Sequence, residues 1–237
     1  LGLTEGLTST GKSPYRFHSL GGYHGAKMRR YQDLLDNRLN FELNDFVTKA
    51  QEGNFDFAGI QTINMMNTKY VIAGTATNAV FENPEANGPA WVPSQIVPVE
   101  TNQEEMDELG RIDTKAQATV NTSEFGEITT GAGEITHTSY TPNELKYQAN
   151  MSQEGLVVFS EIYYPEGWTA TIDGVETDIL RTNYLLRGLV VPAGTHEIVF
   201  KFLPKSYTTT KTPMIIFQYL IVLSLIVGLF LTFKEKK

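Results

Sequence analysis

Cysteine is absent from this sequence of 237 residues, and its absence excludes several kinds of chemistry. Disulfides, zinc–thiolate centres, thiol nucleophiles and dithiol redox motifs all need at least one cysteine. The histidines do not replace it, because His18 and His24 lack a recognised metal-binding spacing and His137 and His196 stand alone. We therefore expect no metal site and no cofactor.

The short motifs of the common catalytic classes are missing as well. The sequence has no GxSxG nucleophile turn, no phosphate-binding P-loop, no HExxH metalloprotease helix and no glycine pattern of a dinucleotide-binding fold. We consequently predict no catalytic residue within this chain.

Positive charge is scarce. Residues 1–212 contain 16 lysines and arginines against 26 aspartates and glutamates, a net charge of −10. Such an acidic surface excludes nucleic acid as a partner and argues against broad adhesion to anionic lipid headgroups. The expected body is acidic and soluble, and it is long enough to bury a core without covalent cross-links.

Charge is missing altogether from residues 213–233 (PMIIFQYLIVLSLIVGLFLTF). About 20 apolar residues, at roughly 1.5 Å rise each, cross a hydrocarbon core about 30 Å thick. A buried core helix of this length would normally show a polar stripe, and this segment has none. We predict a transmembrane helix over residues 213–233 that anchors the chain in a lipid bilayer.

The lysines that follow this segment predict its orientation. Lysines beside a membrane span favour the cytoplasmic side, so residues 234–237 are expected to be a cytoplasmic tail and residues 1–212 to lie outside the cytoplasm. Leu1 is not a methionine and no signal peptide precedes Gly11, so delivery across the membrane requires something upstream. The simplest supposition is that the chain is the C-terminal part of a longer protein, with upstream transmembrane helices as its partners.

Two domains are predicted outside the membrane, and the first is α+β. Residues 1–25 are rich in Gly, Ser and Thr and should form an extended N-terminal segment. Within residues 26–126, apolar residues at intervals of three and four predict two successive helices before Gly53. Thr101 with Glu104 fits the capping box that opens a further helix.

The second domain spans residues 127–206, where the apolar period changes to two. Its candidate strands are residues 135–140, 144–150, 155–163, 168–172, 177–180, 184–191 and 196–203. Several short strands at this spacing are typical of an antiparallel β-sandwich, and we expect Val158 and Phe200 in its core. The fold class is therefore α+β: a small helix/strand domain, then an antiparallel β-sandwich and one C-terminal transmembrane helix.

Several stretches resemble one bacterial family. Residues 21–33 (GGYHGAKMRRYQD), 64–70 (NMMNTKY) and 83–91 (NPEANGPAW) resemble segments of bacterial YfhO-type membrane proteins. Residues 155–168 (GLVVFSEIYYPEGW) and 191–196 (VPAGTH) are similar to the C-terminal sandwich segments of the same family. The segments occur in the family's order, so we treat the resemblance as specific.

The resemblance spans roughly residues 20–207 and departs from the family pattern in two places. At residues 92–94 the family usually continues with an aromatic residue after the tryptophan, and residues 1–15 have no match.

The resemblance implies more than the residues do. YfhO-like proteins are multi-pass and similar to GT-C glycosyltransferases, which use a polyprenyl-phosphate sugar donor outside the cytoplasm. Their catalytic carboxylate is expected in an early outer loop, upstream of this segment. The resemblance thus places the chain in the bacterial inner (cytoplasmic) membrane as part of an enzyme, with no catalytic residue of its own.

Cationic and aromatic side chains in one motif suggest a phosphate or acceptor contact. The candidates are Tyr23, His24, Lys27, Arg29, Arg30 and Tyr31. Guanidinium groups bind phosphate bidentately and an ammonium adds a further charge. The alternative is that Arg29 and Arg30 pair with Asp33 and Asp36 on a solvated helix.

Aromatic residues around Pro165 suggest a second contact. Tyr163, Tyr164 and Trp168 could form a platform on which a sugar stacks, although aromatics in strands more often serve core and edge packing. We therefore predict the extracytoplasmic C-terminal part of a multi-pass glycosyltransferase that uses a polyprenyl-phosphate-linked sugar to modify a cell-envelope glycan or lipid. The alternatives are a noncatalytic glycan-binding module and an envelope scaffold.

Overall fold

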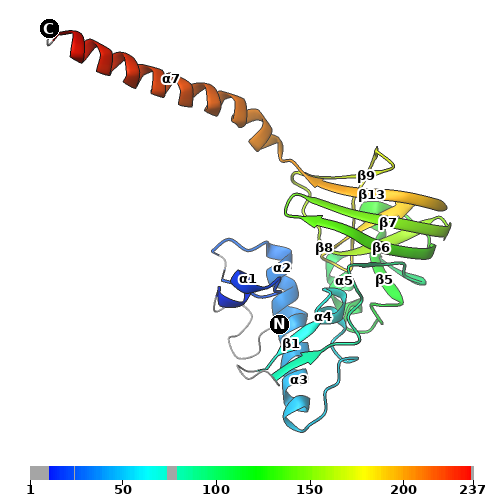
Figure 1. Cartoon of the computed structure of the whole chain (residues 1–237). Helices are drawn as coiled ribbons and strands as arrows, with labels where there is room; N and C mark the ends of the chain where they lie inside the picture. Colours follow the sequence, from blue (N-terminus) through cyan, green and yellow to red (C-terminus); the bar gives the residue numbers. More distant parts are fainter. Residues whose placement is uncertain (1–10, 24, 74–78, 236–237) are drawn as a thin grey trace.

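The computed structural model of the chain describes residues 11–23, 25–73 and 79–235 (Figure 1). The predicted N-terminal segment is therefore seen from Gly11 onward, while His24 and the last two lysines lie outside the described residues. Figure 1 shows a helical part, a stack of two sheets, and one long helix (α7) that projects away from the sheets.

Two sheets stack face to face in the centre of the molecule. One has the strand order β3-β8-β12-β11-β5-β4 and the other has the order β10-β9-β13-β7-β6. The strands are β3 (Ala90–Trp91), β4 (Gln95–Val99), β5 (Gln117–Asn121), β6 (Ala132–Thr141), β7 (Glu144–Gln153), β8 (Gly155–Ile162), β9 (Trp168–Ile172), β10 (Val175–Thr177), β11 (Leu180–Thr182), β12 (Leu186–Val191) and β13 (Gly194–Phe202). The five-stranded sheet is antiparallel throughout, which confirms the predicted antiparallel sandwich.

Local turn chemistry fixes the register of the hairpins. Asp173 and Gly174, between β9 and β10, have φ values of 51° and 81°. Two consecutive residues with positive φ are the signature of the turn that best matches the right-handed twist of a two-stranded ribbon. The turn therefore favours the observed pairing of Val175 with Ile172.

The core between the sheets is aromatic. Tyr147, Phe159 and Phe200 are buried. The ring centroid of Phe159 lies 4.9 Å from that of Tyr147 and 4.9 Å from that of Phe200. The prediction that Phe200 is buried in the sandwich core is confirmed. Val158 is also fully buried, but it faces the other side of its sheet and packs against the helices.

One long helix carries most of the helical part. It comprises α2 (Arg29–Leu34), the π-helical turn η1 (Leu35–Leu39) and α3 (Asn40–Gln51), and the chain leaves it at Gly53 with a φ of 84°. The sequence predicted two helices here. A π-turn shifts the phase of the apolar pattern, so a continuous helix gives the sequence signal of a break.

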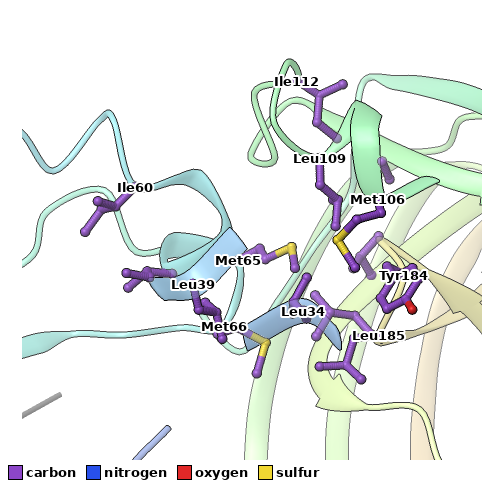
Figure 2. Packing of buried hydrophobic residues seen from close by; sticks show 14 of the residues in the cluster. Leu34, Leu39, Ile60, Met65, Met66, Met106, Leu109, Ile112, Tyr184 and Leu185 are labelled. Carbon is purple, nitrogen blue, oxygen red and sulfur yellow. The ribbon is translucent and has the colours of Figure 1, made fainter. Parts of the chain in front are cut away.

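Shorter elements complete the helical part. They are α1 (Lys12–Arg16), α4 (Gln61–Met65), α5 (Asn102–Glu108), α6 (Thr122–Phe125) and a hairpin of β1 (Tyr70–Ile72) and β2 (Val80–Glu82). Figure 2 shows how Leu34, Met65, Met106 and Leu185 meet where the helices cover the six-stranded sheet. Apolar burial on this face holds the helices against the sandwich.

The six-stranded sheet takes strands from both sides of residue 126, where the sequence places a domain boundary. β3 pairs with β8, and β4 pairs in parallel with β5. The crossover between β4 and β5 runs through α5, whose capping box of Thr101 and Glu104 is formed as predicted. The helical part and the sandwich thus share one sheet.

Helix α7 (Lys205–Glu235) leaves the sandwich directly after β13. Its residues 205–234 are long and apolar enough to cross a membrane, and none of the apolar window is buried in the protein. The helix begins before the predicted position 213. Its first turns are rich in threonine, and the hydroxyls of Thr208, Thr209 and Thr210 donate back to carbonyls of the preceding turn.

Candidate functional site

A cavity of about 340 Å³ lies beside the N-terminal segment. Its volume is in the range of small-molecule sites. It is lined by Pro14, Ser19, Leu20, Gly21, Gly22, Ala26, Lys27, Met28, Tyr31, Met66 and Ile162. The motif that suggested a phosphate contact therefore forms a large part of the wall.

Hydrogen bonds shape the loop that forms this wall. The Tyr31 hydroxyl, carried by α2, donates to the carbonyl of Leu20, and the Gly21 amide donates to Ser19 Oγ at 3.2 Å. Burial raises the pKa of Tyr31 to about 12, so its hydroxyl keeps the proton that it donates. The loop is thereby tied to the long helix.

Buried asparagines support the part of the cavity wall that Met66 forms. Asn83 Nδ2 donates to Asn64 Oδ1 and to the Thr68 carbonyl, each at 2.8 Å. The Asn87 amide donates to the Asn64 carbonyl at 3.1 Å. These bonds hold the end of α4 in place, where Met66 reaches the cavity. The segments 64–70 and 83–91 thus have a structural role.

Lys27 gives the cavity its chemical character. It is half-buried in the wall, and among the described residues it has no ion pair or hydrogen bond. Most other lining side chains are apolar. The cavity therefore combines one free ammonium with an apolar surface, which suits an anionic group attached to an apolar chain. Among the described lining residues, no nucleophile has an adjacent base.

The other residues of the predicted phosphate contact point elsewhere. Tyr23 is exposed, and Arg29 is exposed with its Nε 3.9 Å from Asp33 Oδ2. Arg30 is half-buried, donates from Nη2 to Asn102 Oδ1 at 3.2 Å and lies 5.1 Å above the Tyr184 ring. Of the six candidates, only Lys27 and Tyr31 reach the cavity among the described residues.

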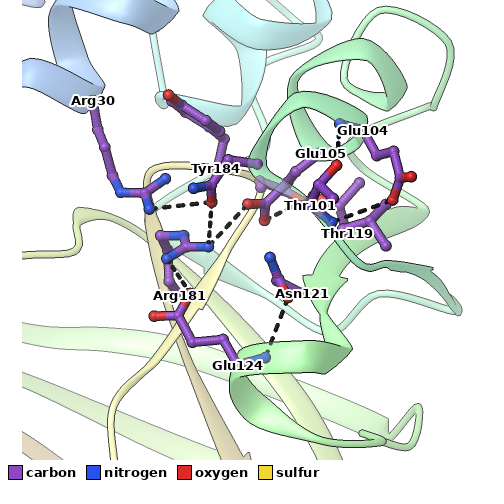
Figure 3. A network of polar contacts seen from close by, with 12 residues as sticks. Arg30, Thr101, Glu104, Glu105, Thr119, Asn121, Glu124, Arg181 and Tyr184 are labelled. Atoms are coloured by element: carbon purple, nitrogen blue, oxygen red, sulfur yellow. Dashed lines mark hydrogen bonds and ion pairs between the residues drawn. The ribbon is translucent and has the colours of Figure 1, made fainter.

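Arg30 belongs to a buried polar network that the sequence did not reveal (Figure 3). Arg181, on β11, is 1% exposed and binds Glu105 at 3.3 Å and Glu124 at 2.7 Å. It also donates to Asn102 Oδ1 at 3.1 Å, so two arginines share one amide oxygen. The network joins α2, α5, α6 and β11.

Burial dominates the electrostatics of Glu105. It raises the pKa of this carboxyl, and the nearby Arg181 guanidinium opposes the shift. Arg181 Nε has no hydrogen-bond partner among the described atoms. The contacts of these residues tie α2, α5 and α6 to the six-stranded sheet.

The predicted stacking residues lie at one end of the sandwich. Tyr163 is half-buried, 6.4 Å from the Phe125 ring, and Tyr164 is exposed. Trp168 is partly buried, with the Arg187 guanidinium 4.0 Å from its ring centroid. One face of Trp168 is therefore occupied by Arg187.

Glu161 and Arg187 place charge at the same end of the sandwich. Arg187 is 3% exposed and donates from Nε to the Ile162 carbonyl at 2.9 Å. Burial lowers the pKa of Arg187 to about 10 and raises the pKa of Glu161. His137 and His18 oppose the rise in the pKa of Glu161, because a positive charge on either ring attracts the carboxylate.

No group of His, Asp and Glu in residues 11–23, 25–73 and 79–235 could hold a metal ion.

Sequence reasoning missed Arg181, Glu105, Glu161 and Arg187. A signal was present for two of them, since Arg181 and Arg187 interrupt otherwise apolar strands in residues 179–191. A charge in such a position is rarely buried unless it is paired.

Comparison with known proteins gives one match. The family described as "Bacterial membrane protein YfhO" matches residues 111–230, which include most of the sandwich and most of α7. No curated protein and no solved structure matches the chain.

Proposed function

Because the chain belongs to the YfhO family of bacterial membrane proteins, we propose that it is the extracytoplasmic C-terminal part of a multi-pass glycosyltransferase of the GT-C type. In this proposal the enzyme takes a sugar from a polyprenyl-phosphate carrier in the inner membrane and modifies a cell-envelope glycan or lipid. The catalytic carboxylate comes from upstream of this chain. The segment described here contributes a subsite for the phosphate of the carrier.

The observation that carries this proposal is the ammonium of Lys27, which has no partner within the described part of the chain and lies in a cavity lined mostly by apolar side chains. A polyprenyl phosphate has an anionic group at the end of a long hydrocarbon. An ammonium can bind the phosphate oxygens by charge-assisted hydrogen bonds, and apolar walls can accept the first part of the chain. Tyr31 supports the loop and does not need to change its protonation.

The position of the cavity also supports the proposal. His18, next to the lining residue Ser19, lies 5.2 Å from the ring of Tyr140 near the β6–β7 turn. The carbonyl of Asn143 in that turn accepts a hydrogen bond from the Phe202 amide, just before α7 begins. A lipid carrier that stays in the bilayer would have to bind at this end of the molecule.

Binding of polyprenyl phosphate by the full-length protein in lipid nanodiscs tests the subsite. Lys27→Gln should weaken binding about 10- to 100-fold, because a hydrogen bond between charged groups contributes about 1.5 to 3 kcal/mol. Lys115→Gln removes the same charge from an exposed ion pair with Glu85 and should leave binding unchanged. Equal binding by both variants would remove the subsite. Carrier binding without sugar transfer in the wild type would favour a noncatalytic glycan-binding or scaffold role.

The proposed orientation has its own test. The chain contains no cysteine, so Ser206→Cys introduces a unique label site at the start of α7. An impermeant maleimide should label it in intact cells, or in spheroplasts where an outer membrane blocks the reagent. Labelling only after lysis would place residues 11–204 in the cytoplasm and contradict the proposal.

A further inference from the structure

Charge is unevenly distributed along the chain. Residues 11–30 and 203–213 contain seven lysines and arginines and no acidic residue, whereas residues 31–202 contain nine basic and 25 acidic residues. The two basic segments are far apart in sequence. An acidic body with a net charge of −16 thus has two cationic stretches with a net charge of +7.

The structure brings these two segments to the same end of the sandwich. The Leu203 amide donates to the Gly167 carbonyl at 2.7 Å, and the Phe202 amide donates to the Asn143 carbonyl at 2.9 Å. These bonds hold the β6–β7 and β8–β9 turns against the base of α7. His18 of the N-terminal segment packs on Tyr140 at 5.2 Å, which brings the part of that segment near Arg16 to the same end, whereas Arg30 lies against Asn102.

Exposed tyrosines lie at this end among the cations. Tyr140 is 50% exposed, Tyr164 41% and Tyr207 51%. Lys211 lies 5.7 Å from the Tyr207 ring centroid, and no described acidic residue pairs with Arg16, Lys205 or Lys211. Tyrosine is enriched where a protein meets the lipid headgroups, since its ring is apolar and its hydroxyl is polar.

We propose that this end of the globular part docks on anionic phospholipid headgroups of the bilayer that holds α7. We call it the collar and define it by Arg16, Tyr140, Tyr164, Lys205, Tyr207 and Lys211. The bilayer is the occupant because the collar is continuous with the helix that crosses it. Its three cations also outnumber Glu166, the exposed carboxylate of the β8–β9 turn, while Glu144 in the neighbouring turn pairs with Lys146 and Lys201.

Docking at the collar is compatible with the acidic net charge of the globular part. A body with a charge of −16 is repelled by an anionic surface, so broad adhesion is still not expected. The same repulsion favours one orientation, in which the collar faces the headgroups and the acidic surface faces away. Docking would hold the globular part upright on the membrane.

Site-directed fluorescence in nanodiscs tests the docking with the whole chain. A fluorophore on Asn143→Cys reports on the collar, and one on Glu154→Cys reports on the opposite end of β7, about 30 Å away at 3.4 Å per residue. The nanodiscs contain a lipid with a nitroxide headgroup as quencher, in either neutral or anionic phospholipid. Quenching at position 143 should be stronger in anionic discs and should fall with added salt.

Charge variants distinguish docking from simple tethering by α7. Replacing Arg16, Lys205 and Lys211 by Gln should lower the ratio of docked to undocked protein in anionic discs by about fivefold per charge, roughly 100-fold in total. Replacing Lys69, Arg111 and Lys115 by Gln makes the same change of net charge far from the collar and should have little effect. Lys27 stays intact in both, so the result is independent of the cavity.

Three outcomes would overturn the proposal. Quenching at position 143 that is equal in neutral and anionic discs would mean that tethering alone brings the collar near the lipid. Equal effects of the two triple variants would mean that only net charge matters. Position 154 must stay unquenched in every disc, because quenching there would mean that the globular part lies on its side.

Discussion

The two faces of the six-stranded sheet are packed in different ways. The inner face meets the five-stranded sheet through Tyr147, Phe159 and Phe200, whose rings contact one another edge to face. The outer face meets the helices through aliphatic and methionine side chains and also through the buried ion pair of Arg181 and Glu105.

The difference separates what stabilises the fold from what positions the cavity. Apolar side chains can be exchanged for others of similar volume at modest cost, whereas a buried charge needs its partner at one place. The polar contacts on the outer face therefore fix α2 and α5 relative to β11. Since α2 carries Tyr31 to the cavity, the geometry of the cavity depends on the contacts of the outer face.

The largest effect is expected on the inner face. Phe200→Ala should lower the free energy of unfolding by about 4 kcal/mol, because it removes a fully buried ring and leaves a cavity. Urea unfolding of the chain in detergent micelles measures this, with Trp91→Phe as background so that only Trp168 emits. Phe41→Ala is the control, since Phe41 is 68% exposed. A loss below about 1 kcal/mol would contradict the apolar account of this face.

A somewhat smaller effect, of another origin, is expected on the outer face. Arg181→Met should cost about 3 kcal/mol, because Glu105 is left buried without its partner. With Trp168→Phe, the emission of Trp91 in the outer cluster follows the change. Adding Glu105→Leu should recover most of the loss, since both charges are then gone. A double variant as unstable as the sum of the single ones would show that the charges act independently.

Much of the fold could be predicted from local patterns. Alternation in β7 places Leu145, Tyr147, Ala149 and Met151 in the core, and this period-two signal predicted the sandwich. The uncharged run that predicted a membrane span is the apolar part of α7. These features depend on residues close in sequence, which is why they could be recognised.

Features that depend on distant partners could not be predicted. The pairing of β3 with β8 and the contact of Arg30 with Asn102 join residues that lie far apart in the chain. The π-turn after α2 hid the continuity of the long helix. For the same reason the motif at 21–33 could not show that Lys27 and Tyr31 line a cavity while Arg30 turns away from it.

The neighbouring arginines of α2 offer a sharper test of the outer face. Arg30→Gln should cost about 1 to 2 kcal/mol, because it loses a charged hydrogen bond to Asn102 and the contact with Tyr184. Arg29→Gln should stay within about 0.5 kcal/mol of wild type, since an exposed pair with Asp33 contributes little. The same urea measurement compares them. Equal costs would mean that the Asn102 contact adds no stability.

The smallest effect concerns the polar end of the inner face. The Glu161 carboxylate has no hydrogen bond among the described residues, and burial raises its pKa against the attraction of Arg187, His137 and His18. A raised carboxyl pKa means that the folded state holds the proton more tightly than the unfolded state. The resulting stabilisation is complete below the unfolded pKa, near 4.5, and is lost as the pH rises through the folded pKa.

Glu161→Gln removes this dependence, because an amide does not ionise. The variant should match the wild type below about pH 4, where the carboxyl is protonated in both the folded and the unfolded state, and exceed its free energy of unfolding by about 1 kcal/mol at pH 8, the scale of relieving one buried, unpaired polar group. Glu134→Gln removes an exposed carboxylate from the same sandwich and should follow the wild-type pH profile. Parallel profiles for wild type and Glu161→Gln would mean that Arg187 and the two histidines compensate fully for burial, and that the inner face has no polar weak point.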